Sequence, residues 1–221
     1  MVEPDLGLIT RFGLARDRLI GPAAADSGAA GAFARLCWLA TGQDRSVFPF
    51  AMSDDWVQSA LNLPKWVWMN ATMREGLAAS LYNLLNDAKS EAALDRRDAL
   101  LAELRGLAAA YPEDAAVRER LAMGLFNTLN DAKSEEALDR RDALLAELRG
   151  LAAAYPEDAA VREMFVKGLL VTGLDVSGAA GEDEIAEKIQ TLLVEVSNLA
   201  AKFPDDLLLA DVMSRLSGED N

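Results

Sequence analysis

Residues 86–119 read NDAKSEAALDRRDALLAELRGLAAAYPEDAAVRE, and residues 130–163 read NDAKSEEALDRRDALLAELRGLAAAYPEDAAVRE. The two strings differ only where Ala92 of the first copy becomes Glu136 in the second, 44 residues further along the chain. Chance does not produce such identity. The chain therefore contains a tandem duplication, either recent or engineered.

Looser copies of the same unit flank this pair. The segment MREGLAASLYNLLND from Met73 matches VRERLAMGLFNTLND from Val117 in most apolar positions, and VREMFVKGLLVTGLD continues the series from Val161. After an insertion of four residues, the segment from Ile185 follows the second half of the unit. About three units are predicted, and they cover residues 72–110, 114–154 and 158–202.

Each unit is predicted to form two helices. In the middle unit, apolar residues recur at four-residue steps from Val117 through Leu121 and Leu125 to Leu129, which places them in one stripe of a first helix. Asp114 or the glutamate before it supplies the N-cap. No part of the unit alternates with the period of a strand, so this region is predicted to be all helix.

The second helix of the unit is predicted to bury one face and to leave the other in water. Its apolar face holds Leu138, Leu145, Leu148, Leu151 and Tyr155, and its solvated face holds Arg140, Arg141, Asp142 and Glu147. Ser134 is placed to cap the helix. The helix is expected to end at Tyr155, because the residue before a proline avoids helical geometry.

A two-helix unit cannot bury its apolar stripe alone, so the copies must stack and share a core. We therefore predict an all-α fold, a right-handed α-solenoid of stacked antiparallel helix pairs. The solenoid covers residues 72–216 and ends in an amphipathic capping helix over residues 205–216. Residues 217–221 are expected to form a frayed tail.

The pattern resembles a tetratricopeptide repeat, whose first helix carries a large-then-small pair at a fixed distance after a proline. The matching residues are Leu77, Ala78 and Leu81, then Leu121, Ala122 and Leu125, and then Phe165, Val166 and Leu169. Two features depart from the family, since the unit has 44 residues rather than about 34 and its first helix starts with Arg74, Arg118 or Arg162 in place of an aromatic residue. The length suits HEAT or armadillo units equally well, but the proline between units favours the tetratricopeptide reading.

The resemblance implies that first helices line a concave face, where equivalent side chains of successive units form rows whose members recur at about 10 Å. The partner-binding residues expected there are Glu75, Tyr82, Asn83, Glu119, Met123, Phe126, Asn127, Glu163, Lys167 and Leu170. An acidic row beside an apolar one suits a basic, partly apolar protein or peptide. The alternative is that these rows are plain surface repeated by duplication.

Residues 1–71 have no repeat copy and hold all four tryptophans, Trp38, Trp56, Trp66 and Trp68. We expect helices over residues 5–19 and 29–40, then a short helix that Ser53 caps. The segment is interpreted as a helical N-terminal cap whose tryptophans pack in the core. A sharper alternative is a partner or self-association surface built around Trp66 and Trp68.

Composition excludes several functions. The 221 residues include 22 Lys and Arg, 36 Asp and Glu and no histidine, which gives a formal charge of −14. Such a charge repels nucleic acid and anionic membranes. Cys37 is the only cysteine, so a disulfide within the chain and a cysteine-based zinc site are impossible, and a buried, inert thiol is expected.

No catalytic, cofactor or metal site is recognised in the sequence. We expect a non-catalytic interaction module, an adaptor or scaffold in the cytoplasm, which binds a protein or peptide on its concave face and for which self-association is possible. The alternative is an acidic regulatory or inhibitory subunit that occludes a partner enzyme by mimicking nucleic acid.

Overall fold

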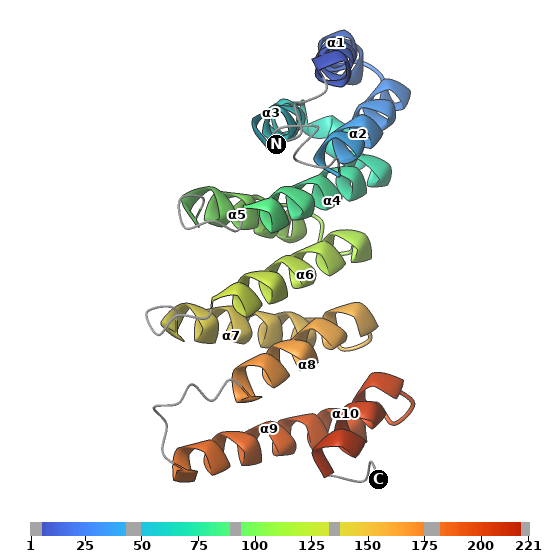
Figure 1. Cartoon of the computed structure of the whole chain (residues 1–221). Helices are drawn as coiled ribbons and strands as arrows, with labels where there is room; N and C mark the ends of the chain where they lie inside the picture. The colour runs from blue at the N-terminus through green and yellow to red at the C-terminus, as the bar shows by residue number, and fades with distance from the viewer. Residues whose placement is uncertain (1–5, 43–49, 89–93, 133–137, 175–181, 218–221) are drawn as a thin grey trace. The chain divides into compact units, whose positions relative to one another are not determined.

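The computed structural model describes residues 6–42, 50–88, 94–132, 138–174 and 182–217 (Figure 1). All regular structure in these ranges is helical, with no strand, so the predicted all-α class is confirmed. From residue 218 onward, the predicted frayed tail lies outside the described residues. The predicted cap Ser134 also lies outside them. In the described part of the chain, no helix is long and apolar enough to cross a membrane.

The chain divides into two compact units, unit 1 over Met1–Gly124 and unit 2 over Leu125–Asn221. The helices are α1 (Leu6–Ala23), α2 (Ser27–Thr41), α3 (Phe50–Leu61), the short 3₁₀ helix η1 (Lys65–Met69), α4 (Ala71–Asp87), α5 (Leu94–Ala110), α6 (Ala115–Asp131), α7 (Leu138–Ala154), α8 (Ala159–Leu174), α9 (Glu182–Lys202) and α10 (Leu207–Ser217). Each predicted repeat unit thus contains two helices. The predicted capping helix corresponds to α10.

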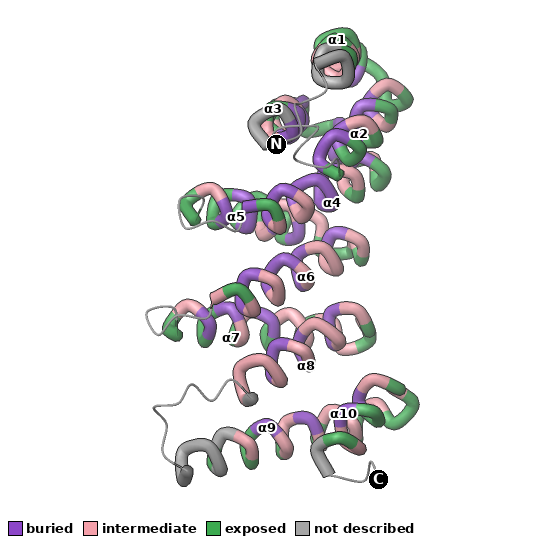
Figure 2. The backbone as a smooth tube through the Cα atoms, in the orientation of Figure 1, coloured by how far each residue is buried: buried purple, intermediate pink, exposed green. Residues whose placement is uncertain are grey.

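In unit 1, α2 packs against α1, α3 and α4, and α4 packs against α5. Figure 2 shows buried stretches along α2 and α4, with exposed stretches on the same helices between them. The core of the N-terminal helices centres on Trp56, whose ring centroid lies 5.1 Å from that of Phe33 and 6.2 Å from that of Phe12. The N-terminal helices and the first repeat pair therefore belong to one compact unit.

In unit 2, α7 packs against α8, α8 against α9, and α9 against α10. The core includes Leu148, Val161, Phe165, Val166 and Val196, all of which are buried.

The stripe predicted on the first helix of the middle repeat is confirmed, because Val117, Leu121, Leu125 and Leu129 are all buried along α6.

The predicted faces of α7 are partly wrong. Leu138 is exposed because it is the first residue of α7, whereas Leu144 is buried although it was not assigned to the apolar face. Arg141, which was expected in solvent, is only 5% exposed, and its Nη2 donates to the carbonyl of Val171 at 3.2 Å. The last four carbonyls of a helix have no partner within it, so a buried guanidinium stabilises the end of α8.

Ser53 does not cap a helix as predicted. It lies inside α3, and its hydroxyl donates to the carbonyl of Ala40 in the last turn of α2 at 2.9 Å. The observed cap of α2 is Asp26, and that of α4 is Asn70; each accepts a hydrogen bond at 2.9 Å from a backbone N–H of its helix. Asp114 caps α6 by accepting from the N–H of Val117, which selects it over the preceding glutamate.

An arginine links successive helix pairs in unit 1. Arg74 of α4 donates through Nε to Oδ2 of Asp114 at 2.6 Å, while Oδ1 of the same aspartate caps α6. The guanidinium lies over the ring of Tyr111 and donates through Nη1 to the carbonyls of Trp68 and Met69. One side chain thereby joins α4, the end of the preceding 3₁₀ helix and the start of α6.

The same linkage recurs in unit 2. Arg162 of α8 donates through Nε to Oδ2 of Asp206 at 2.7 Å, lies 4.0 Å from the ring centroid of Phe203 and donates to the carbonyl of Pro156. Oδ1 of Asp206 accepts from backbone N–H groups at the start of α10. We call these two clusters the arginine linkages.

Candidate binding site

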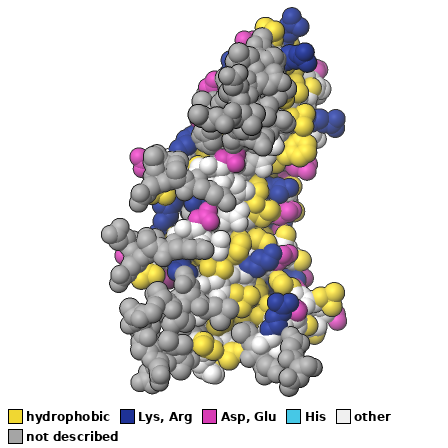
Figure 3. Space-filling view, in the orientation of Figure 1, with side chains coloured by type: hydrophobic (Ala, Val, Ile, Leu, Met, Phe, Trp, Pro, Cys, Tyr) yellow, Lys and Arg dark blue, Asp and Glu magenta, His cyan; other side chains and the backbone are white. Residues whose placement is uncertain are grey.

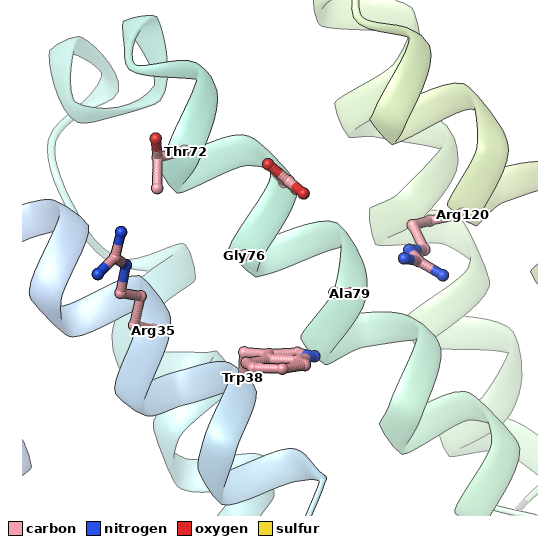
Figure 4. A pocket seen from close by; sticks show the side chains of 7 residues that line it. Arg35, Trp38, Thr72, Gly76, Ala79 and Arg120 are labelled. Carbon is pink, nitrogen blue, oxygen red and sulfur yellow. The ribbon is translucent and has the colours of Figure 1, made fainter.

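A pocket of about 390 Å³ opens in unit 1 between α2, α4 and the N-terminal half of α6. We call it the Trp38 pocket (Figure 4). Its lining residues come from all three helices and are Arg35, Trp38, Thr72, Glu75, Gly76, Ala79 and Arg120. One of them, Glu75, belongs to the predicted concave face.

Small residues on α4 make room for the pocket. At Gly76, a Cβ atom would lie 2.9 Å from the Cβ of Ala34, so α2 and α4 approach too closely for a larger residue. Ala79 follows on the same face of α4 and is buried. These two positions form a shallow floor, beside which the ring of Trp38 stands at the edge of α2 (Figure 4).

Trp38 is half-exposed, with 50% of its surface accessible, although α2 buries its other face. The buried residues of that helix are Ala30, Phe33, Ala34, Cys37, Ala40 and Thr41. The expectation that the N-terminal tryptophans pack in the core holds for Trp56 and Trp68 and is wrong for Trp38 and Trp66. The helical periodicity of α2 could have predicted the exposure of Trp38, because this residue falls beside the buried stripe of the helix and not on it.

The pocket carries charges of both signs. Arg35 and Arg120 lie on opposite sides of it in Figure 4, and Glu75 lies on α4 between α2 and α6. Arg120 stacks 5.8 Å from the ring centroid of Tyr82, and its Nη1 lies 3.4 Å from the sulfur of Met123. Within the described residues, no ion pair involves Arg35, Glu75 or Arg120, so all three charges are available to a ligand.

None of the ten predicted partner-binding residues is buried. In unit 1, Glu75 lines the pocket and Tyr82 and Met123 contact Arg120, whereas Asn83 donates to the hydroxyl of Thr41 at the end of α2. The fifth predicted residue of this unit, Glu119, is half-exposed on α6.

In unit 2, the predicted residues lie on α6 and α8. Lys167 donates to Oε1 of Glu163 at 2.6 Å, which neutralises this member of the predicted acidic row. Phe126, Asn127 and Leu170 are half-exposed.

The structure adds six pocket residues that reasoning from the repeat missed, among them the small residues Gly76 and Ala79 of α4. Arg35 and Trp38 belong to the N-terminal segment, which has no repeat copy, and Thr72 and Arg120 lie outside the predicted rows. Only contacts between helices that are distant in sequence bring these residues to one place.

The buried thiol of Cys37 lies on α2 and is 1% exposed, as predicted. Burial raises its pKa to about 12, and a hydrogen bond with Ser80 offsets part of this rise. Since the thiolate is the reactive form, Cys37 is not a nucleophile at neutral pH. Among the side chains that the structure describes, no group of three or more His, Cys, Asp or Glu could hold a metal ion.

The pocket therefore combines an indole face, two guanidinium groups and a carboxylate around a floor of small residues. These groups offer a ligand an apolar ring face and charges of both signs. No protein-family model, curated protein or solved structure matches the chain.

Proposed function

We propose that this protein is a non-catalytic interaction module that binds a protein or peptide. In this proposal the repeated helix pairs form a tetratricopeptide-like α-solenoid, and the partner contacts the exposed faces of the first helices α4, α6 and α8. The stacking is inferred from the sequence repeat, because two-helix units bury their apolar stripes only against one another. The N-terminal helices contribute Arg35 and Trp38 to the binding surface.

The observation that carries the proposal is the exposed Trp38 beside two arginines. Tryptophan and arginine are among the residues most enriched in interface hot spots, where a large side chain becomes fully desolvated against a partner. A half-exposed indole gains from such burial because it moves apolar surface out of water. The small residues Gly76 and Ala79 leave space beside the ring for a partner side chain.

The charges favour a partner of particular composition. The net charge of −14 attracts a basic protein over distances up to the Debye length, about 8 Å at physiological salt. At closer range the Trp38 pocket presents side chains of both positive and negative charge. On the face shown in Figure 3, acidic and basic side chains are interspersed among apolar ones. The partner is therefore a basic, partly apolar polypeptide whose contact segment also carries a group that pairs with arginine.

A peptide-display selection against the protein, followed by calorimetric titration of the selected peptide, tests the proposal. Substituting Trp38→Ala is expected to weaken binding by about 30-fold, because hot-spot truncations cost about 2 kcal/mol. The matched control is Trp66→Ala, which removes another exposed tryptophan that does not line the pocket.

For the control we expect a dissociation constant within about twofold of that of the parent. A second pocket variant, Arg35→Ala, is also expected to weaken binding, because it removes an arginine that lines the pocket. Its control is Arg18→Ala, which removes an exposed arginine of α1 that lies outside the pocket. The proposal would be contradicted if the pocket variants and their controls lost equal binding affinity. It would also be contradicted if no binding peptide could be selected.

A further inference from the structure

A second pocket, also of about 390 Å³, lies within unit 2 between α7, α8 and α9. Its apolar lining consists of Leu145, Leu169 and Leu192, one leucine from each helix. Leu169 and Leu192 are almost fully buried. Gly173 lets α8 approach α9, because a Cβ atom there would lie 3.0 Å from Cδ2 of Leu192. We call this the leucine-floored pocket.

Carboxylates stand around this floor. Asp142 of α7 and Glu187 and Glu195 of α9 line the pocket, and Arg149 is the only cation among the lining residues. Glu195 is already paired, since Nε and Nη2 of Arg149 donate to its two carboxylate oxygens at 2.8 and 3.1 Å. The hydrogen bonds to Glu195 raise the pKa of Arg149.

Two carboxylates remain for a ligand. Asp142 and Glu187 are exposed, and neither forms an ion pair within the described residues. The lining therefore carries a net charge of −2, and residues 172–221 as a whole carry −8. The local charge and the charge of the surrounding segment have the same sign, so both favour a cation.

We propose that the leucine-floored pocket binds a lysine or arginine side chain of a basic amphipathic peptide. The charged head lies between Asp142 and Glu187, and the methylene stem lies on the leucines. Long basic side chains bury their stems on apolar surfaces in this manner while the head stays at the rim. The inference rests on the proposed function, because it names a basic peptide as the partner.

Other ligands fit less well. An anion meets repulsion from the rim, and a neutral apolar molecule leaves the two carboxylates without a counter-charge. A metal ion is disfavoured because no group of three or more potential ligands is present among the described residues. The combination of an apolar floor with two free carboxylates favours a cation that carries an aliphatic stem.

The duplication supplies a matched control. Asp142 lines the pocket, whereas its counterpart Asp98 in the first copy does not, and Glu103 on the same helix is likewise an exposed acid outside the pocket. The double variants Asp142→Asn/Glu187→Gln and Asp98→Asn/Glu103→Gln therefore remove the same charge. Only the first pair removes it from the pocket.

The probe is a fluorescein-labelled amphipathic peptide of leucine and lysine, titrated by anisotropy at about 0.15 M NaCl. We expect its dissociation constant to rise at least about tenfold for the pocket double variant and to stay within about twofold for the control. Circular dichroism confirms that both variants are folded. Equal weakening of the two variants would overturn the inference, because it would show attraction to the net charge alone.

A second probe tests the leucine floor. It carries 2,4-diaminobutyrate in place of each lysine, which keeps the charge and shortens each stem by two methylenes. We expect about tenfold weaker binding, because the lost methylenes no longer cover the leucines. Equal affinity of the two probes would contradict the assigned floor.

The Trp38→Ala variant separates this inference from the proposed function. It is expected to bind the lysine probe as the parent does, because Trp38 does not line the leucine-floored pocket. If the pocket double variant binds the lysine probe no more weakly than its control does, while Trp38→Ala still weakens binding of a selected peptide, only the present inference is wrong. If the lysine probe behaves as expected but Trp38→Ala binds the selected peptide as tightly as the parent does, the assignment of the Trp38 pocket is wrong.

Discussion

At the scale of single residues, Gly76 decides whether α2 can lie against α4. A Cβ atom at this position would meet the Cβ and the backbone oxygen of Ala34 at 2.9 and 3.3 Å. Backbone atoms of a packed helix cannot give way as a flexible side chain can. The glycine therefore sets the helix spacing that underlies the Trp38 pocket.

Replacing Gly76 by alanine is expected to lower the free energy of unfolding by about 1–3 kcal/mol, the cost of overpacking a close contact. The control is Gly106→Ala in α5, where a Cβ would meet nothing within 4 Å. That change should raise stability by about 0.5–1 kcal/mol, because alanine is the better helix former. Urea unfolding of both variants measures the difference, and a stabilised Gly76→Ala protein would contradict the assigned close approach.

Arg74 and Arg162 occupy equivalent positions in the first turn of the helices α4 and α8. In the structure, Arg74 and Arg162 contact the aromatic rings of Tyr111 and Phe203 and pair with the capping aspartates. The arginine at this position thus has a physical role, since one guanidinium contacts a carboxylate, a ring face and a carbonyl.

At the scale of helices, the arginine linkages hold the start of a later helix to an earlier one. In unit 2, Arg162 is 11% and Asp206 15% exposed by side chain, so their charges are largely shielded from water. Removing one partner of such a pair leaves the other charge poorly solvated. The linkage should therefore matter more to stability than an ion pair on the surface.

The substitution Arg162→Met is expected to destabilise the protein by about 2–3 kcal/mol, because it leaves Asp206 without its charged donor. The comparison is Arg215→Met in α10, which removes an exposed i,i+4 pair with Asp211. That change should cost at most about 0.5 kcal/mol. Thermal unfolding followed by circular dichroism measures both, and equal effects would show that the linkage is no stronger than a surface pair.

At the scale of the whole molecule, the dominant quantity is the net charge of −14. Repulsion among the surplus carboxylates opposes the compact state and is screened by salt. The well-shielded arginine linkages are screened less. Added salt should therefore remove more repulsion than attraction.

Raising the NaCl concentration from about 0.01 to about 0.1 M, which shortens the Debye length from about 30 to about 10 Å, is expected to raise Tm by about 2–4 °C at pH 7. The effect should shrink at pH 5, closer to the pI of 4.4, because the net charge is smaller there. Calorimetric scans at both pH values measure it. A Tm that falls with salt at pH 7 would show that ion pairs, rather than net repulsion, dominate the electrostatics.

The sequence was informative where a structural feature depends on residues that are close together in the chain. The helical period from Val117 to Leu129 predicted a buried stripe, and every member is buried, because a stripe repeated every turn has one face to bury. The burial of Cys37 followed from an apolar helix in the same way. The two-helix units and the final helix also lie where the repeats and the prolines placed them.

The sequence was less informative where a side chain contacts a helix that is distant in the chain. Arg141 was assigned to solvent as a charged residue, yet it is buried at the open carbonyl end of α8. Ser53 was assigned as a cap, yet it bonds to the end of α2. Nothing in the neighbouring residues reveals which carbonyl lies within reach.

The amino-acid order alone determined that this chain is helical, where its helix pairs begin and end, and which stripe of each first helix is apolar, because hydrogen bonding and periodicity act within a few residues. Only the tertiary structure decided which tryptophans face water, how Arg35, Glu75 and Arg120 come to surround one pocket, and that leucines of three helices form the floor of another. These features depend on how closely separate helices approach, and that distance is set by contacts such as Gly76 against Ala34 and Gly173 against Leu192, which join residues far apart in the chain.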